Sequence, residues 1–231
     1  MNDKKLNLKI TFFGDSIFTG QGVSIYKGWV TKLASFFDDY SKDLNYEFLI
    51  TNSSVNGRTT RIALEDMQYQ VMSQGVDILV LQFGLNDCNC WATDFGMPRV
   101  SKAAYIENLK EIIDRARVAG ASKILLNNNH PTSRTKVFMP GTDKTFEDSN
   151  KEYSLAVNEV CSKLGPHVRF QNIYQSFKDV LSETKLDITD FLLEDGLHLN
   201  ERGHEVYYSL MRPLIISATE DIVQNKFLVL R

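Results

Sequence analysis

The chain has 231 residues, of which 43% are hydrophobic and 24% are charged, which is typical of a soluble globular protein with one sizeable core. The formal net charge is only −3, and basic residues do not gather into a stripe, so nucleic acid is not an expected partner. The sequence contains no repeat, low-complexity tract or Pro/Gly/Ser linker, and we therefore expect one domain over residues 1–231.

Five short apolar runs, each bounded by turn-forming residues, are predicted to be β-strands. In chain order they are Leu8–Phe13, Tyr46–Thr51, Asp77–Phe83, Lys123–Asn127 and Val168–Ile173. None is long enough to cross a bilayer, so no membrane span is expected.

Longer stretches between and after these runs repeat their apolar residues with the period of a helix. They are Lys27–Tyr40, Thr60–Ser73, Tyr105–Ala119, Asn150–Leu164 and Glu201–Ala218. Because strands alternate with helices, the pattern predicts a three-layer α/β/α sandwich around a parallel sheet of about five strands. Two stretches, Cys88–Val100 and Pro131–Ser149, lack a clear period, and loops of this length are often functional.

A serine follows the first predicted strand in the sequence Gly14-Asp15-Ser16. Open parallel sheets bind ligands at the carboxyl ends of their strands, and a serine there could act as a nucleophile if a base removed its proton. Taken alone, the short motif also fits a turn or a helix cap.

Near the other end of the chain, Asp195-Gly-Leu-His198 places a carboxylate three residues before a histidine. A histidine supplies a general base, and a carboxylate orients it and stabilises the imidazolium. This pair alone also fits a helix cap beside a polar histidine.

Two further strand ends carry groups that could stabilise an oxyanion. Asn86, in Gly84-Leu-Asn86-Asp87, offers a side-chain amide, and Gly57 offers a backbone N–H that a substrate can approach closely. Each is by itself compatible with an ordinary turn. Since a parallel sheet brings its strand ends to one edge, Ser16, Gly57, Asn86 and the Asp195–His198 pair are expected to meet there.

This set, in this order, resembles the SGNH (GDSL-like) hydrolases, which are named for a serine, a glycine, an asparagine and a histidine. The resemblance covers about the whole chain, and the stretch from Phe191 to His204 is most similar to the isoamyl-acetate-hydrolysing esterase group. Ile17 stands where the GDSL signature has leucine. The resemblance implies a flavodoxin-like sheet and a serine esterase.

The same resemblance implies the roles of the residues. Ser16 would attack the ester, His198 would act as base and Asp195 would hold His198. The backbone N–H groups of Ser16 and Gly57 and the amide of Asn86 would form the oxyanion hole. An acyltransferase using the same triad, or a non-catalytic binding module on the same fold, remain as alternatives.

Several other residues are candidates for lining the substrate site. Asp15 is one candidate, although we expect both Asp15 and Asp87 to brace the loops rather than to take part in the chemistry. Arg58 could contact an acidic group of the substrate, but we expect it, like Arg61, to be a solvated cation. His130 ends the fourth predicted strand, and Trp91 and Phe138 lie in the two long loops, where they form an acyl pocket or anchor the loops.

The remaining expectations concern surroundings. The start of the chain is charged and passes into a strand without a signal-like apolar segment, so a cytoplasmic location is expected. The odd set Cys88, Cys90 and Cys161 fits reduced thiols, and Cys88-x-Cys90 without a second pair is a poor zinc signature. No metal or other cofactor is expected, the expected partner is a small-molecule ester, and the sequence does not indicate an oligomeric state.

Overall fold

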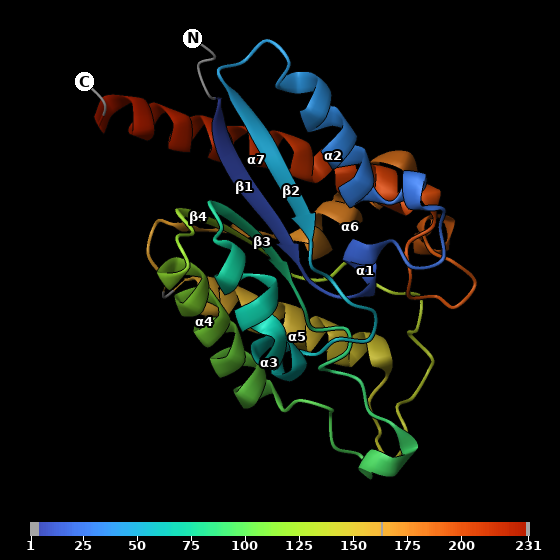
Figure 1. The fold of residues 1–231 in the computed structure, drawn as a ribbon. Helices are drawn as coiled ribbons and strands as arrows, with labels where there is room; N and C mark the ends of the chain where they lie inside the picture. Colours follow the sequence, from blue (N-terminus) through green and yellow to red (C-terminus); the bar gives the residue numbers. More distant parts are fainter. Residues whose placement is uncertain (1–4, 163, 230–231) are drawn as a thin grey trace.

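The computed structural model describes residues 5–162 and 164–229, built around a five-stranded, wholly parallel sheet (Figure 1). The strands are β1 (Leu6–Phe13), β2 (Tyr46–Asn52), β3 (Ile78–Gln82), β4 (Lys123–Asn127) and β5 (Val168–Gln171). Their order is β2-β1-β3-β4-β5, which is the flavodoxin-like order. The predicted fold class is confirmed. The charged residues 1–4 lie outside the described residues.

Helices cover both faces of this sheet (Figure 1). They are α1 (Ser16–Thr19), α2 (Trp29–Tyr40), α3 (Thr60–Gln70), α4 (Lys102–Val118), α5 (Phe146–Cys161), α6 (Ile173–Thr184) and α7 (Glu201–Val229). Contacts between α3 and α4 and between α4 and α5 join one layer, whereas α7 contacts α2 and α6 in the other. Short 3-10 turns η1 (Ile25–Lys27), η2 (Met72–Gln74), η3 (Ala92–Asp94) and η4 (Ile188–Phe191) lie in the connections. Among the described residues, no helix combines the length and apolarity needed to traverse a bilayer.

Three helices differ most from the sequence-based prediction, and caps explain two of these differences. The last strand ends at Gln171 because Asn172 caps a helix, α6, which was not predicted; its side chain accepts from the N–H of Gln175. Helix α5 begins at Phe146 rather than Asn150, since Thr145 and Asp148 form a capping box. Helix α7 continues past the predicted end at Ala218.

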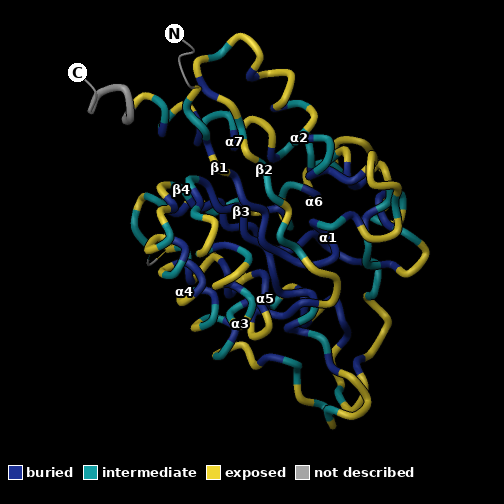
Figure 2. The backbone as a smooth tube through the Cα atoms, in the orientation of Figure 1, coloured by how far each residue is buried: buried dark blue, intermediate teal, exposed yellow. Residues whose placement is uncertain are grey.

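The core lies on both sides of the central strands, and Figure 2 shows the buried backbone running through the middle of the molecule. All five residues of β3 are buried, as expected for a central strand of a parallel sheet. On the α2/α7 face, the rings of Phe12, Phe18, Trp29 and Tyr207 pack at centroid distances of 4.5–6.1 Å. Trp29 also donates to the carbonyl of Ile17 at 3.2 Å, which anchors α1.

The register of the sheet determines which loops meet. Phe13 pairs with Leu81, and Gln82 pairs with Asn127, so β1, β3 and β4 end at nearly the same level. The segments that follow these strands therefore leave the sheet side by side at its carboxyl edge, which is where the candidate residues lie.

Candidate active site

Ser16 is the first residue of the short helix α1, which begins directly after β1. The side chain of Asp15 caps this helix by accepting from the N–H of Ile17 at 3.0 Å. Gly14 is required at the turn because a Cβ there would lie 3.0 Å from the Gln82 carbonyl oxygen. This tight strand-to-helix turn places the Ser16 hydroxyl at the carboxyl edge of the sheet.

The structure brings Ser16, His198 and Asp195 into one hydrogen-bonded chain. Ser16 Oγ lies 2.9 Å from His198 Nε2, and His198 Nδ1 lies 2.5 Å from Asp195 Oδ2. Because a carboxylate accepts, the proton of the neutral ring belongs on Nδ1, which leaves the lone pair of Nε2 facing the serine hydroxyl. This is the tautomer that can remove the serine proton.

Asp195 is held in place by the backbone of its own loop. Its Oδ1 accepts from the N–H groups of Leu197 at 2.9 Å and His198 at 3.0 Å. Partial burial alone would raise the pKa of Asp195, but the hydrogen bonds from the His198 ring and these two N–H groups outweigh it and lower the pKa. Asp195 therefore stays ionised beside the ring.

The two candidate oxyanion residues lie on neighbouring loops. Gly57 follows β2 with φ at +74°, a conformation that favours glycine, and it is exposed. Asn86 follows β3 and is half-buried; its Nδ2 lies 3.4 Å from Asp15 Oδ2. The amide thus faces the turn that carries Ser16, and nothing lies within 4 Å of the position that a Gly57 side chain would take.

Arg99 connects these two loops and was not identified from the sequence. Its Nη1 donates to the Gly57 carbonyl at 3.2 Å and lies 3.5 Å from Asn86 Oδ1, while its guanidinium packs over the Trp91 ring at 4.3 Å. No motif marked this arginine, because it ends a loop without periodicity. It orients the Asn86 side chain with the oxygen towards the cation and the N–H group away from it.

Residues 12–206 match the sequence model of the GDSL-like Lipase/Acylhydrolase family. The chain belongs to this family. The predicted membership of the GDSL-like family is confirmed, whereas the likeness to the isoamyl-acetate-hydrolysing group stays a prediction. This GDSL-like hydrolase is an SGNH-type serine hydrolase, and a catalytic triad and an oxyanion hole are features of its family.

Solved structures of similar fold cover most of the hydrolase. Axe2, an acetylxylan esterase from Geobacillus stearothermophilus, matches with a TM-score of 0.69 at 17% identity, over 90% of this chain and 94% of that one. The lipase/acylhydrolase from Enterococcus faecalis matches with a TM-score of 0.68 at 23% identity, over 90% and 95%. At these identities the likeness shows the fold.

One curated protein is similar over a shorter stretch. Over 77 residues the hydrolase is 36% identical to "Uncharacterized lipoprotein YqeF" from Bacillus subtilis (strain 168), which is 33% of this chain. The match spans 31% of the length of that protein.

Two buried carboxyl groups, those of Asp15 and Asp87, support the loops of the site. Asp87 accepts from the backbone N–H and the hydroxyl of Thr60, at 2.9 and 2.5 Å, and so fixes the start of α3. Asp15 is fully buried and caps α1, which agrees with the expectation that it braces a loop. Burial raises the pKa of Asp15 to about 7 and that of Asp87 to about 6.

Arg58 and His130 are also buried, so the expectation that Arg58 is a solvated cation is wrong. Arg58 is not solvated and does not reach the substrate site: it donates to the Ser53 carbonyl at 2.7 Å and pairs with Asp66 at 2.9 Å. The His130 ring is fully buried, and its Nε2 lies 2.8 Å from the Leu197 carbonyl. Both side chains therefore support the loops instead of contacting substrate. Arg61 is exposed, as expected.

The aromatic candidates in the long loops are exposed. Trp91 is 52% exposed and lies beside the site through its contact with Arg99. Phe138 is 62% exposed on the second loop, where it bridges to Thr145. Trp91 is thus linked through Arg99 to Gly57 and Asn86, whereas Phe138 pairs with Thr145 at the far end of its own loop.

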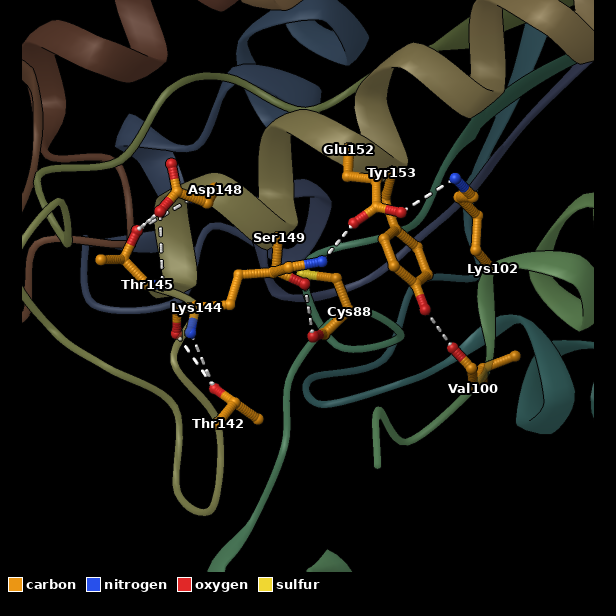
Figure 3. Close-up of polar contacts among 10 residues, drawn as sticks. All are labelled: Cys88, Val100, Lys102, Thr142, Lys144, Thr145, Asp148, Ser149, Glu152 and Tyr153. Atoms are coloured by element: carbon orange, nitrogen blue, oxygen red, sulfur yellow. Dashed lines mark hydrogen bonds and ion pairs between the residues drawn. The ribbon is translucent and has the colours of Figure 1, made fainter. Parts of the chain in front are cut away.

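Both long loops of the hydrolase are fastened at their bases to α5, as Figure 3 shows. Ser149 Oγ donates to the Cys88 carbonyl at 3.0 Å, and the Tyr153 hydroxyl donates to the Val100 carbonyl at 2.6 Å. Glu152 pairs with Lys102 at 2.8 Å and with Lys144 at 2.6 Å. A cavity of about 410 Å³ lies between these loops, and the residues that line it do not include the triad. The two loops are therefore joined through α5 around this cavity.

Proposed function

We propose that this serine esterase cleaves acyl esters of small or carbohydrate-linked alcohols through an acyl-enzyme on Ser16. The observation that carries the proposal is the chain Ser16–His198–Asp195, with heavy-atom distances of 2.9 and 2.5 Å. These distances suit a nucleophile, its base and the group that orients the base.

In the first half of the reaction, Ser16 Oγ attacks the ester carbonyl carbon as its proton moves to His198 Nε2. The carbonyl oxygen becomes an oxyanion, which accepts from the N–H groups of Ser16 and Gly57 and from Nδ2 of Asn86. The tetrahedral intermediate then expels the alcohol, which takes the proton from His198. An ester now joins Ser16 to the acyl group.

In the second half, a water molecule replaces the alcohol. His198 takes one proton from water as the oxygen attacks the acyl-enzyme, and it returns that proton to Ser16 Oγ as the acid leaves. Asp195 stays ionised throughout and stabilises the imidazolium. The lowered pKa of Asp195 supports this role.

The surroundings of the site support a polar alcohol group. An exposed indole can pack on the apolar face of a sugar ring, and the exposed Trp91 contacts Arg99, which in turn contacts Gly57 and Asn86. The partly exposed Arg99 offers N–H donors that suit sugar hydroxyls. The similar fold named as an acetylxylan esterase agrees with a carbohydrate-linked acyl ester.

A fluorophosphonate probe and two substrates test the proposal. The wild-type protein should be labelled at Ser16 and should hydrolyse both p-nitrophenyl acetate and acetylated xylo-oligosaccharides. Ser16→Ala should lose labelling and hydrolysis, while the matched control Ser73→Ala, an exposed serine of the 3-10 turn η2, should keep both.

Product analysis with an added alcohol acceptor distinguishes hydrolysis from acyl transfer. Release of the free acid in the presence of the acceptor supports the esterase, and transfer of most acyl groups to the acceptor contradicts it. Folded wild-type protein that neither reacts with the probe nor hydrolyses esters would refute the proposed chemistry.

A further inference from the structure

The loop that joins Asp195 to His198 has three consecutive carbonyl groups bound by one other segment. Arg134 Nε donates to the Asp195 carbonyl at 2.9 Å, and the Ser133 N–H donates to the Gly196 carbonyl at 3.0 Å. His130 Nε2 lies 2.8 Å from the Leu197 carbonyl, and it carries the proton because a carbonyl only accepts. We call His130, Ser133 and Arg134 the carbonyl bracket.

The carbonyl bracket is held by buried contacts to neighbouring elements. It leaves β4 through buried residues, and the His130 ring packs against Phe177 at a centroid distance of 5.7 Å. Thr132, which lies between His130 and Ser133 in the chain, donates through its N–H and its hydroxyl to the buried carboxylate of Glu147, at 2.8 and 2.7 Å. The hydroxyl of Tyr174 donates to the other oxygen of Glu147 at 2.8 Å. The bracket is thus tied to α5 and α6.

Several other backbone groups of this loop are also held by hydrogen bonds. Asp195 Oδ1 accepts from the N–H groups of Leu197 and His198, and the His198 carbonyl accepts from the Leu193 N–H at 2.7 Å. The peptide planes between the acid and the base are therefore held from both sides. Their orientation sets the position of the His198 ring, which must reach Ser16 and Asp195 at once.

We propose that the carbonyl bracket consists of positioning residues for the reaction, which keep the Asp195–His198 loop in the one orientation that aligns the base with Ser16. The inference rests on the proposed esterase mechanism. A displacement of about 1 Å in a reacting group can lower a rate by 10²-fold, so the bracket affects catalysis without touching the substrate. His130 itself is no rival base, since its proton-bearing nitrogen is engaged with Leu197 and burial lowers its pKa to about 4.

The test replaces the buried donor and then restores it. His130→Phe keeps a planar ring but removes the N–H group, and His130→Gln offers an N–H group again. We expect kcat for p-nitrophenyl acetate to fall by about 10- to 100-fold in His130→Phe with little change in KM, and to recover largely in His130→Gln.

Two readouts separate positioning from mere stability. A looser loop weakens the pairing of His198 with Asp195, so the rise of kcat/KM with pH should move to lower pH in His130→Phe. The far-downfield proton resonance of the Nδ1–H group of His198 should weaken in the same variant. A lowered melting temperature with wild-type kcat, pH profile and proton resonance would overturn the inference.

Arg134 gives a second test that does not depend on a buried substitution. Arg134→Ala removes the donor to the Asp195 carbonyl from a partly exposed position and should also lower kcat, whereas Lys136→Ala, on the exposed part of the same loop, should not. This pair decides the question if His130→Phe does not fold, and equal kcat values for the pair would then overturn the inference. If the wild-type protein hydrolyses no ester, the proposed function fails; if it does and the bracket variants match it, the inference alone fails.

Discussion

The Asn86→Ala variant distinguishes two roles of this side chain, oxyanion donor and turn residue. For an oxyanion donor, the structure predicts a large loss of rate and a small loss of stability. The Asn86 amide makes two long contacts, 3.4 Å to Asp15 and 3.5 Å from Arg99, and the side chain is half-buried. Neither contact is short enough to contribute much, so its loss should cost under about 1 kcal/mol of folding free energy.

The transition state is different, because the oxyanion draws a hydrogen bond from Nδ2 as its charge develops. Losing one such donor lowers kcat by about 10²–10³, or about 2.7–4 kcal/mol. Asn86→Ala should therefore show that loss in kcat with KM nearly unchanged, and the fluorophosphonate probe should still label Ser16, because nucleophile and base remain.

A matched control comes from the same loop. The Asn89 side chain accepts from the Cys90 N–H at 2.9 Å, so Asn89→Ala should lower the melting temperature while kcat stays nearly unchanged. Steady-state kinetics on both variants beside their melting curves make the comparison. Wild-type kcat in folded Asn86→Ala would remove this amide from the oxyanion hole.

Three further outcomes follow from the residues around the site. The pKa values of Asp15 and Asp87 are raised by burial to about 7 and 6, so these two carboxyl groups bind more protons in the folded state than in the unfolded state between about pH 4 and 7. The contribution of these two groups to stability should therefore fall as pH rises through this window. In urea unfolding, the free energy of unfolding of Asp15→Asn should rise relative to that of the wild type as pH rises, and a difference between the two proteins that does not change with pH would contradict the assignment. Arg99→Ala should lower kcat by at most about tenfold, less than the loss of the Asn86 amide itself, because the Asn86 side chain is freed to rotate, and Arg99→Lys should recover part of kcat. Arg58→Ala should instead lower the free energy of unfolding by about 2–3 kcal/mol, since it leaves a buried carbonyl without its donor, while the folded fraction keeps its kcat; a fall in kcat of the folded fraction would place Arg58 in the reaction after all.

The sheet could be predicted from the sequence because each strand is an apolar run between turn formers. The run Lys123–Asn127 was predicted with the bounds that the structure has, and the other strands differ by one or two residues at an end. Helix α6 was missed although its signal is present: Asn172 is a cap, and Ile173 and Phe177 are buried four residues apart. The capping box at Thr145 is likewise readable in the sequence.

The supports of the site are not readable in this way, because their partners lie far away in the chain. Arg58 looks like a surface cation until the fold places Phe13 under its guanidinium at 5.0 Å. Arg99 and Arg134 lie in loops without a period, and their acceptors are carbonyl groups, which carry no residue-specific signal. A motif identifies the groups that react, whereas the groups that hold them emerge only from three-dimensional contact.

A buried network connects the two halves of the proposed triad across 182 positions of the chain. It begins at Asp15, next to the nucleophile, and reaches Gln82 at 3.4 Å; the amides of Gln82 and Asn129 lie 2.6 Å apart, and those of Asn129 and Asn150 lie 3.0 Å apart. Asn150 then donates to the His130 carbonyl at 3.0 Å. From there the carbonyl bracket continues to the loop of the base.

Such a network is costly to build, because buried amides and carboxylates lose their hydration and must find partners in the protein. Apolar side chains of similar volume would fill the same space with less risk to stability. Polar groups, however, accept only certain distances and angles, so a satisfied network fixes the relative positions of its members more closely than apolar packing does. The raised pKa of Asp15 shows that this cost is borne next to Ser16, where accurate placement matters most for an attack on an ester carbonyl.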